Sequence, residues 1–119
     1  MEDISQHVLT VVEKPWGRTV EIARGFSWCL KILELEPNQR FSLQQHEHRT
    51  EYWLVAAGEG TVQTGWKIRR ALPGKFFYIP RLRRHRLTAG PHGLYVVELQ
   101  RGICKEEDIE RLEDDYGRT

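Results

Sequence analysis

Several features that mark common classes of protein are missing from this sequence. Its two cysteines, Cys29 and Cys104, lie far apart and form no Cys-x-x-Cys pair, so we do not expect a zinc–thiolate site. No apolar run is long enough to span a bilayer, and the first residues lack the basic start and apolar stretch of a secretion signal. These absences favour a protein of the reducing cytoplasm, with no membrane partner.

A large excess of one charge is also missing. The 119 residues include 18 Lys and Arg against 17 Asp and Glu, which gives a net charge of +1. No overall field draws such a chain to nucleic acid, so we expect no nucleic-acid partner. A chain of this length corresponds to one domain, which we take as residues 1–119.

What the sequence does contain is a series of short, strand-like segments. Turn signals recur about every eight to twelve residues and separate segments rich in β-branched and aromatic residues. The expected strands are residues 28–36, 51–58, 60–66, 75–80 and 94–100. Helical spacing occurs near the end, in residues 105–117, where Ile109 and Leu112 lie among charged residues. We therefore predict an all-β sandwich or barrel with a short C-terminal helix.

The segment LQQHEHRTEYW, from Leu43 to Trp53, concentrates imidazole and carboxylate groups in a strand-like region. Side-chain alternation places Gln44, His46 and His48 on one face, and after a bend Glu51 can join them. A metal ion is one reason for such a cluster in a half-buried segment. A solvated hairpin end is the other.

A second cluster lies in PRLRRHRL, from Pro80 to Leu87. His85 shares a face with Leu87, while Arg84 and Arg86 take the opposite face. A histidine beside an inward leucine is either a core residue with satisfied hydrogen bonds or, next to the first cluster, a metal ligand. The arginines form either a solvated face or an anion site.

Both segments resemble motifs of the cupin family. The pattern N-x5-Q-x-H-x4-E-x6-G from Asn38 to Gly58 is similar to the first cupin motif, G-x5-H-x-H-x4-E-x6-G. The pattern G-x5-P-x-L-x2-H-x3-A from Gly74 to Ala89 is similar to the second, G-x5-P-x-G-x2-H-x3-N. The resemblance implies a double-stranded β-helix, which is a jelly-roll-like barrel.

Within the cupins, the chain resembles the C-terminal domain of type II phosphomannose isomerases from end to end. The shared stretches are KPWG at residues 14–17, SLQ-x-H-x-HR-x-E-x-W at 42–53, YIP-x4-HRL at 78–87 and EDI-x-R-x-ED-x-YGR at 107–118. The chain departs from the family at Glu47 and Tyr52, where histidine is usual, and at Asp115, where arginine is usual. The family's Gly-rich guanylyltransferase signature is absent, so we expect no GDP-mannose synthesis from this chain.

The resemblance also implies a site. Its metal ligands are Gln44, His46, Glu51 and His85, a set that suits Zn²⁺, Mn²⁺, Fe²⁺, Co²⁺ or Ni²⁺. The two histidines and Glu51 alone match the facial set of non-haem Fe(II) oxygenases, and a fourth ligand from Gln44 argues against that chemistry. The residues assigned to catalysis are Lys31, His48 and Arg118, and those assigned to substrate binding are Arg49, Trp16 and Tyr52.

The implied reaction is the isomerisation of mannose 6-phosphate to fructose 6-phosphate. The metal acts as a Lewis acid, and a base carries a proton between C2 and C1. Lys31 is the candidate base because it alternates with Leu33 and Leu35 on one strand face, although its ammonium can also reach water. The alternatives are a cupin that binds a sugar phosphate without turnover, or an oxygenase. We also expect a homodimer formed through an exposed strand at residues 7–12.

Overall fold

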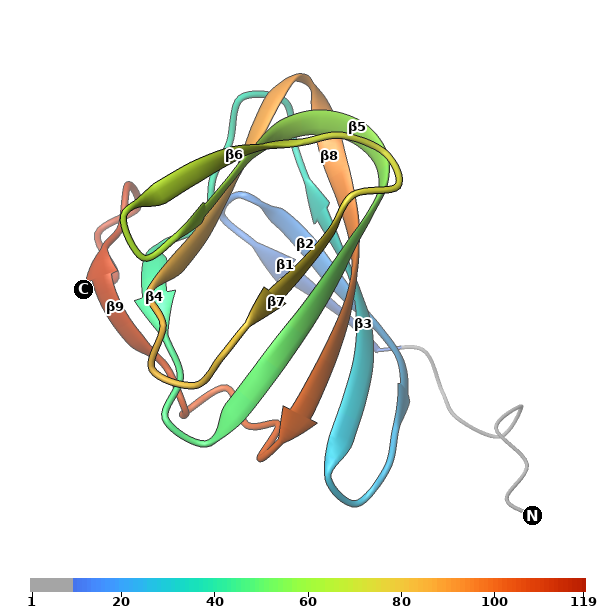
Figure 1. The fold of residues 1–119 in the computed structure, drawn as a ribbon, viewed down its shortest axis with the longest axis vertical. Helices are drawn as coiled ribbons and strands as arrows, with labels where there is room; N and C mark the ends of the chain where they lie inside the picture. The colour runs from blue at the N-terminus through green and yellow to red at the C-terminus, as the bar shows by residue number, and fades with distance from the viewer. Residues whose placement is uncertain (1–9) are drawn as a thin grey trace.

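Antiparallel strands make up the fold of residues 10–119, the part of the chain that the computed structural model describes (Figure 1). The strands are β1 (Thr10–Lys14), β2 (Gly17–Arg24), β3 (Trp28–Leu35), β4 (Leu43–Gln45), β5 (Arg49–Thr64), β6 (Lys67–Ala71), β7 (Phe76–Ile79), β8 (His85–Gly102) and β9 (Glu110–Glu113). No helix forms among these residues, so none is present there that could cross a membrane.

Two long strands, β5 and β8, form the spine of the barrel. They pair along their whole length, from Arg49 opposite Gly102 to Thr64 opposite His85. β8 also pairs with β3, which continues the sheet to β2 and β1, while β5 carries β6 and β7 on its other side. Because both strands pair with neighbours along both of their edges, the single sheet curls around a central core (Figure 1). The predicted all-β, jelly-roll-like fold is confirmed.

The bend of β5 lies at Gly58-Glu59-Gly60, which the sequence predicted as a turn between two strands. Instead, residues 51–58 and 60–66 largely belong to one strand with two register shifts. Gly58 has a φ of +78°, and a Cβ there would lie 2.2 Å from the carbonyl oxygen of Gly93. The glycine allows the two strands to approach closely, so the bulge bends the chain without ending the strand.

The core is made by the inward residues of the long strands and their neighbours. Alternation puts Trp53 and Val55 of β5, and Leu94 and Val96 of β8, at 0–1% exposure. His85 and Leu87 point inward together, as their spacing predicts. The inward-pointing His85 is therefore packed among apolar core residues, including Phe41 and Trp53.

The predicted C-terminal helix is wrong. Residues 110–113 form β9, which pairs with β4 and places Arg111 opposite Gln44. The Asp108 carboxylate accepts backbone N–H groups from Glu47 and His48 at 3.0 Å each. These long-range contacts stabilise residues 105–119, the tail, in a conformation that contains β9 instead of a helix. The polar groups of the tail then bond to the barrel rather than to one another within a helix.

The strand predicted at residues 7–12 lies partly outside the described residues. Its described part begins β1, which pairs with β2 at the edge of the sheet. Val11 and Val12 are 49% and 41% exposed there.

Replacing Leu87 by alanine should lower the free energy of unfolding by about 2–5 kcal/mol, because its side chain is fully buried and truncation leaves a cavity. Leu54→Ala is the matched control. Leu54 is 43% exposed on the outer face, and its truncation should cost at most about 1 kcal/mol. Urea unfolding followed by tryptophan fluorescence measures both. Equal losses would contradict the assignment of inward and outward faces.

Candidate metal centre and its cavity

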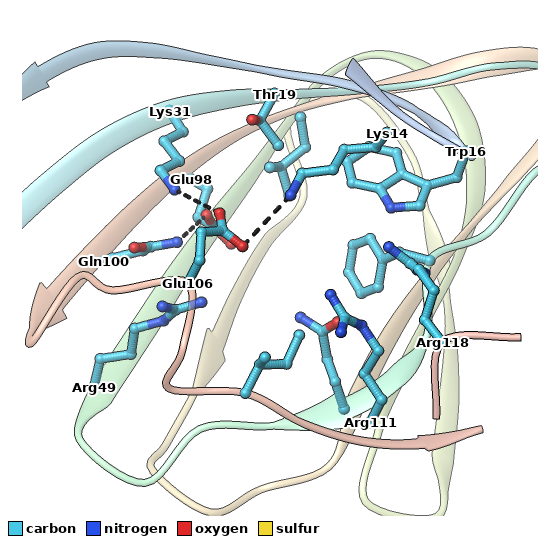
Figure 2. A pocket seen from close by; sticks show the side chains of 14 residues that line it. Lys14, Trp16, Thr19, Lys31, Arg49, Glu98, Gln100, Glu106, Arg111 and Arg118 are labelled. Carbon is cyan, nitrogen blue, oxygen red and sulfur yellow. Dashed lines mark hydrogen bonds and ion pairs between the residues drawn. The ribbon is translucent and has the colours of Figure 1, made fainter. Parts of the chain in front are cut away.

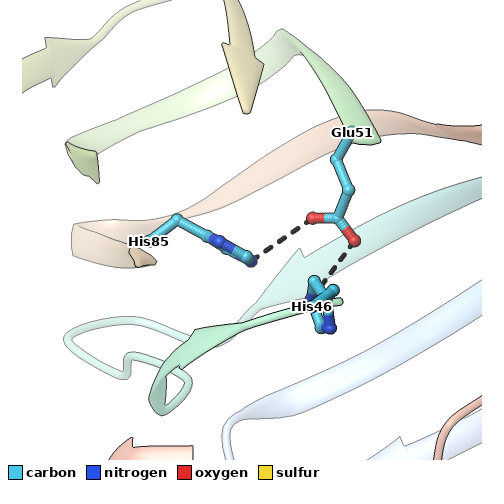
Figure 3. A group of neighbouring side chains, drawn as sticks. All are labelled: His46, Glu51 and His85. Carbon is cyan, nitrogen blue, oxygen red and sulfur yellow. Dashed lines mark ion pairs between the residues drawn. The ribbon is translucent and has the colours of Figure 1, made fainter. Parts of the chain in front are cut away.

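Three buried side chains from three segments meet inside the barrel (Figure 3). His46 follows β4, Glu51 lies in β5 and His85 opens β8. The His46 Nε2 atom lies 3.4 Å from Glu51 Oε2, and His85 Nε2 lies 3.4 Å from Glu51 Oε1. One ligand atom from each residue falls within 4.8 Å of the other two. We call these three residues the triad.

Backbone carbonyls fix the tautomers of both imidazoles. His46 Nδ1 donates to the Asp108 carbonyl at 2.5 Å, and His85 Nδ1 donates to the Arg83 carbonyl at 2.9 Å. Each ring therefore turns the lone pair of Nε2 toward Glu51. Burial lowers the pKa of His46 to about 3, with the Arg49 charge adding to the effect, and burial lowers the pKa of His85 to about 4. Both rings are neutral ligands near neutral pH.

The triad fits a divalent cation. Glu51 Oε1 and His85 Nε2 are buried and have no hydrogen-bond partner within residues 10–119. They are acceptors that face one another, so a cation between them would satisfy both. Two imidazoles and a carboxylate suit Zn²⁺, Mn²⁺, Fe²⁺, Co²⁺ or Ni²⁺. Carbonyls that orient the far ring nitrogens are typical of metal-binding histidines.

Arg49 lies directly against the triad. Its guanidinium donates to Glu51 Oε2 at 3.0 Å, to His46 Nε2 at 3.1 Å and to the Lys105 carbonyl at 3.1 Å. Its side chain therefore partly neutralises Glu51. A metal ion bound to His46 would displace the guanidinium from Nε2 while leaving its bond to the carboxylate available. Arg49, which the sequence predicts to bind substrate, therefore contacts the triad as well as lining the cavity described below.

Gln44 is close enough to be the fourth ligand that the resemblance implies. Its Nε2 lies 3.3 Å from His46 Nε2, and its Oε1 accepts a hydrogen bond from Ser42 Oγ at 2.7 Å. A half-turn of the amide would present the oxygen to the triad, and the Ser42 hydroxyl could then accept from the amide nitrogen. Ligation by Gln44 stays a prediction.

A cavity opens beside the triad, past Gln44 and Arg49 (Figure 2). Five cationic side chains line it, namely Lys14, Lys31, Arg49, Arg111 and Arg118. Two carboxylates, Glu98 and Glu106, lie among them. Trp16 forms part of the wall and packs edge-on against Phe41, with ring centroids 5.6 Å apart. The excess of positive charge suits an anionic ligand.

Lys31 and Arg118 both face this cavity, as the sequence-based assignment requires. Lys31 Nζ lies 3.7 Å from Glu106 Oε1, in an ion pair that Figure 2 shows. Arg118 is held by Asp114 through two side-chain hydrogen bonds of 2.9 Å. Both residues are therefore placed to meet a ligand, although each already has a carboxylate partner.

His48 and Tyr52 lie away from the cavity. β4 ends at Gln45, so the chain turns after it and the predicted shared face of His46 and His48 is wrong; the His48 side chain is 51% exposed. Tyr52 alternates onto the outer face of β5 and packs against Tyr78 and Phe76. Their assigned roles in catalysis and substrate binding stay predictions without a contact to the cavity.

Two charged residues have structural partners that the sequence did not reveal. Asp115, where the resemblance leads one to expect arginine, forms a two-pronged ion pair with Arg40 at 2.7 and 2.8 Å. Arg86, predicted to be solvated or anion-binding, is 5% exposed and donates to the carbonyls of Phe41 and Glu113. It fastens the tail to the barrel.

Sequence reasoning missed Glu98, a buried carboxylate on the cavity wall. It lies in β8 opposite Lys31 and is 4% exposed. Trp53 Nε1 donates to its Oε2 at 2.9 Å, and Gln100 Nε2 donates to its Oε1 at 2.7 Å. Burial and then the Glu51 charge raise its pKa to about 7. The signal was in the sequence, since Glu98 alternates with Leu94 and Val96 on one strand face.

A jelly-roll barrel that holds two histidines and a glutamate in its interior is a cupin. The solved structure of the cupin-2 domain Rru_A2000 from Rhodospirillum rubrum superposes with a TM-score of 0.71 over 84% of this chain and 78% of that one, at 16% identity, which supports the fold alone. The model of the family described as "Mannose-6-phosphate isomerase C-terminal" matches residues 2–114. The chain belongs to this family.

Curated relatives agree with that assignment. The alginate biosynthesis protein AlgA of Pseudomonas aeruginosa is 39% identical over 110 residues, which cover 91% of this chain and 23% of the relative. The mannose-1-phosphate guanylyltransferase ManC of Salmonella typhimurium is 32% identical over 115 residues, which cover 95% of this chain and 24% of the relative. The chain therefore spans about a quarter of the length of these proteins.

His46→Ala and His85→Ala should each weaken divalent-metal binding by more than the ~10–100-fold loss typical of removing an outer-shell partner, because each removes a lone pair of the triad. His48→Ala is the matched control, an exposed imidazole outside the triad, and should bind metal like wild type. Equilibrium dialysis with elemental analysis for Zn, Mn, Fe, Co and Ni measures affinity and preference. Equal losses in all three variants would contradict the assignment.

Proposed function

We propose that this chain catalyses the metal-dependent isomerisation of a sugar phosphate, interconverting mannose 6-phosphate and fructose 6-phosphate. The observation that carries the proposal is the arrangement of the site: a triad of neutral imidazoles and a carboxylate lies beside a cavity lined by five cations, with Gln44 and Arg49 between the two. The family to which the chain belongs supports the choice of reaction.

The two ends of the cavity would have different roles in this reaction. A divalent ion held by the triad would supply Lewis-acid polarisation of the sugar's oxygens. Away from the triad, Lys14, Arg111 and Arg118 offer donors for a phosphate, and Arg111 Nε is buried without a partner among the described residues. Trp16 contributes a rigid apolar wall. The substrate is thereby bound by its phosphate and oriented for chemistry at C1 and C2.

The expected outcome is turnover of mannose 6-phosphate by metal-loaded wild type, and a fall of at least ~100-fold in His46→Ala, since the Lewis acid is lost with the metal. A coupled assay for fructose 6-phosphate, with metal content measured in each sample, checks this. His92→Ala, which removes an exposed imidazole outside the triad and the cavity, should keep both metal and turnover.

Three results would go against the isomerase. Equal rates in wild type and His46→Ala would exclude a metal-dependent mechanism. Saturable binding of mannose 6-phosphate by metal-loaded wild type, without turnover, would instead support a sugar-phosphate-binding cupin. Iron-dependent oxygen uptake without isomerisation would support an oxygenase.

We also propose that two copies pair through β1 in a cytoplasmic setting. The exposed valines at 11 and 12 on the edge strand support the pairing, and the free thiols Cys29 and Cys104 are consistent with a reducing compartment. Val11→Lys combined with Val12→Lys should convert a dimer into a monomer by adding charge to the contact. Ile68→Lys, at a still more exposed apolar position on β6 (65% exposed), is the control and should leave the dimer intact.

Light scattering at micromolar concentration measures the mass of each variant. A monomeric wild type would refute the pairing, and a double-lysine variant that stays dimeric would move the contact away from β1.

A further inference from the structure

The isomerisation of a sugar phosphate needs a group that moves a proton between C2 and C1, and the cavity offers few. The guanidinium groups of Arg111 and Arg118 do not deprotonate in proteins. The triad imidazoles already use Nδ1 for backbone carbonyls and direct Nε2 toward Glu51. Apart from Lys14, which pairs with Glu106 at 3.4 Å, the proton carriers on the cavity wall are Lys31, Glu98 and Glu106.

Solvent exposure and pairing separate these three groups. Glu106 is 62% exposed and lies within 3.4 Å of Lys14 and 3.7 Å of Lys31, so it is an exposed carboxylate between two ammonium groups. Lys31 forms the ion pair with that carboxylate. Glu98, by contrast, is 4% exposed and sits deeper along the wall, between β3 and β5 (Figure 2).

The carboxylate of Glu98 is held in one orientation. Trp53 donates to one oxygen and Gln100 to the other, so rotation of the carboxylate would break both hydrogen bonds. Each oxygen keeps a further lone pair with which to accept a proton. Because both donors are themselves buried, the group is preorganised rather than recruited when a ligand arrives.

We propose that Glu98 is the general base that removes the proton from C2 and returns it to C1, an assignment that rests on the isomerase function proposed above. Glu98 then replaces Lys31 as the base. Lys31, directly opposite on β3, takes the role of passing the hydroxyl proton between the two sugar oxygens.

The atoms balance without an external oxidant or reductant. In the open-chain aldose, the C2–H bond breaks, the proton goes to a Glu98 oxygen, and the electron pair forms a C1–C2 double bond while charge moves to O1. Lys31 gives a proton to O1 and takes the proton of O2. The electrons of the O2–H bond then form the ketone at C2, and Glu98 returns its proton to C1. Both side chains end as they began.

The surroundings of Glu98 suit this task. Burial and the Glu51 carboxylate on β5 favour its neutral form, while Arg49 on β5, the Trp53 hydrogen bond and Lys31 on β3 favour its charged form. Their sum raises its pKa to about 7, close to the value at which a group can accept and release a proton equally well. Glu106, in the segment after β8, is the ion-pair partner of Lys31.

The decisive variant is Glu98→Gln, which keeps shape and can still accept from Trp53. In metal-loaded protein its kcat should fall by ~10²–10⁴-fold, with KM and metal content close to wild type. Exchange of the C2 hydrogen of mannose 6-phosphate with solvent deuterium, followed by NMR, should disappear as well. Lys31→Met is the comparison, because exchange at C2 should persist in that variant while net isomerisation slows.

The pH dependence of kcat/KM tests the role of Glu98 directly, because a residue with only a structural role would not change it. In wild type, kcat/KM should rise with pH through about 7, because the base must be ionised. Glu98→Asp keeps a carboxylate and should retain the acidic limb at a lower rate, whereas Glu98→Gln should lose it.

The possible failures are distinguishable. Active wild type together with Glu98→Gln within about fivefold of its rate would overturn the assignment of Glu98 alone. Loss of C2 exchange in Lys31→Met but not in Glu98→Gln would return the role of base to Lys31. Wild type that binds metal but shows neither turnover nor exchange would overturn the isomerase function and the base with it.

Discussion

The buried carboxylate of Glu51 is the constraint on which this end of the barrel depends. It is 1% exposed, and a charged carboxylate at that depth is costly unless positive charge or hydrogen-bond donors surround it. Arg49 supplies one such donor, and it can do so because it lies two residues earlier on the same strand face. The two imidazoles add lone pairs rather than donors, which is the opposite of what an isolated carboxylate needs. A divalent cation, in addition to the Arg49 guanidinium, would stabilise both the carboxylate and the lone pairs of the imidazoles.

The tail of the chain is part of that arrangement. Carbonyls at Lys105 and Asp108 hold Arg49 and His46, and the Asp108 carboxylate fixes the turn that separates His46 from His48. Arg86 binds the same tail to the barrel through Glu113. The orientation of the His46 imidazole is thus tied to a segment about sixty residues further along the chain. Loosening the tail would release the ring of His46, so the tail is part of what holds the candidate metal centre together.

Local periodicity predicted the parts of the structure that local forces determine. Strand alternation placed His85 with Leu87, and the motif spacing brought His46, Glu51 and His85 together. The predictions were wrong where contacts between residues far apart in the sequence determine the local structure. The bulge at Gly58 depends on the backbone of Gly93, and the helical pattern of residues 105–117 yielded to pairing with β4. Alternation with Leu94 and Val96 marks Glu98 as inward, but its partners Trp53 and Lys31 lie on the two neighbouring strands, which no spacing within β8 records.

The positions at which the chain departs from its family fall outside the cavity. Glu47 has a side chain that is 69% exposed, Tyr52 packs on the outer face of β5, and Asp115 is neutralised by Arg40. The interior, by contrast, combines neutral imidazoles with a surplus of cations and a buried carboxyl beside them. A substitution on the outer face changes no contact between the triad and the cavity. These three substitutions are therefore compatible with the chemistry of the site. Any effect they have is expected on the outer surface of the protein.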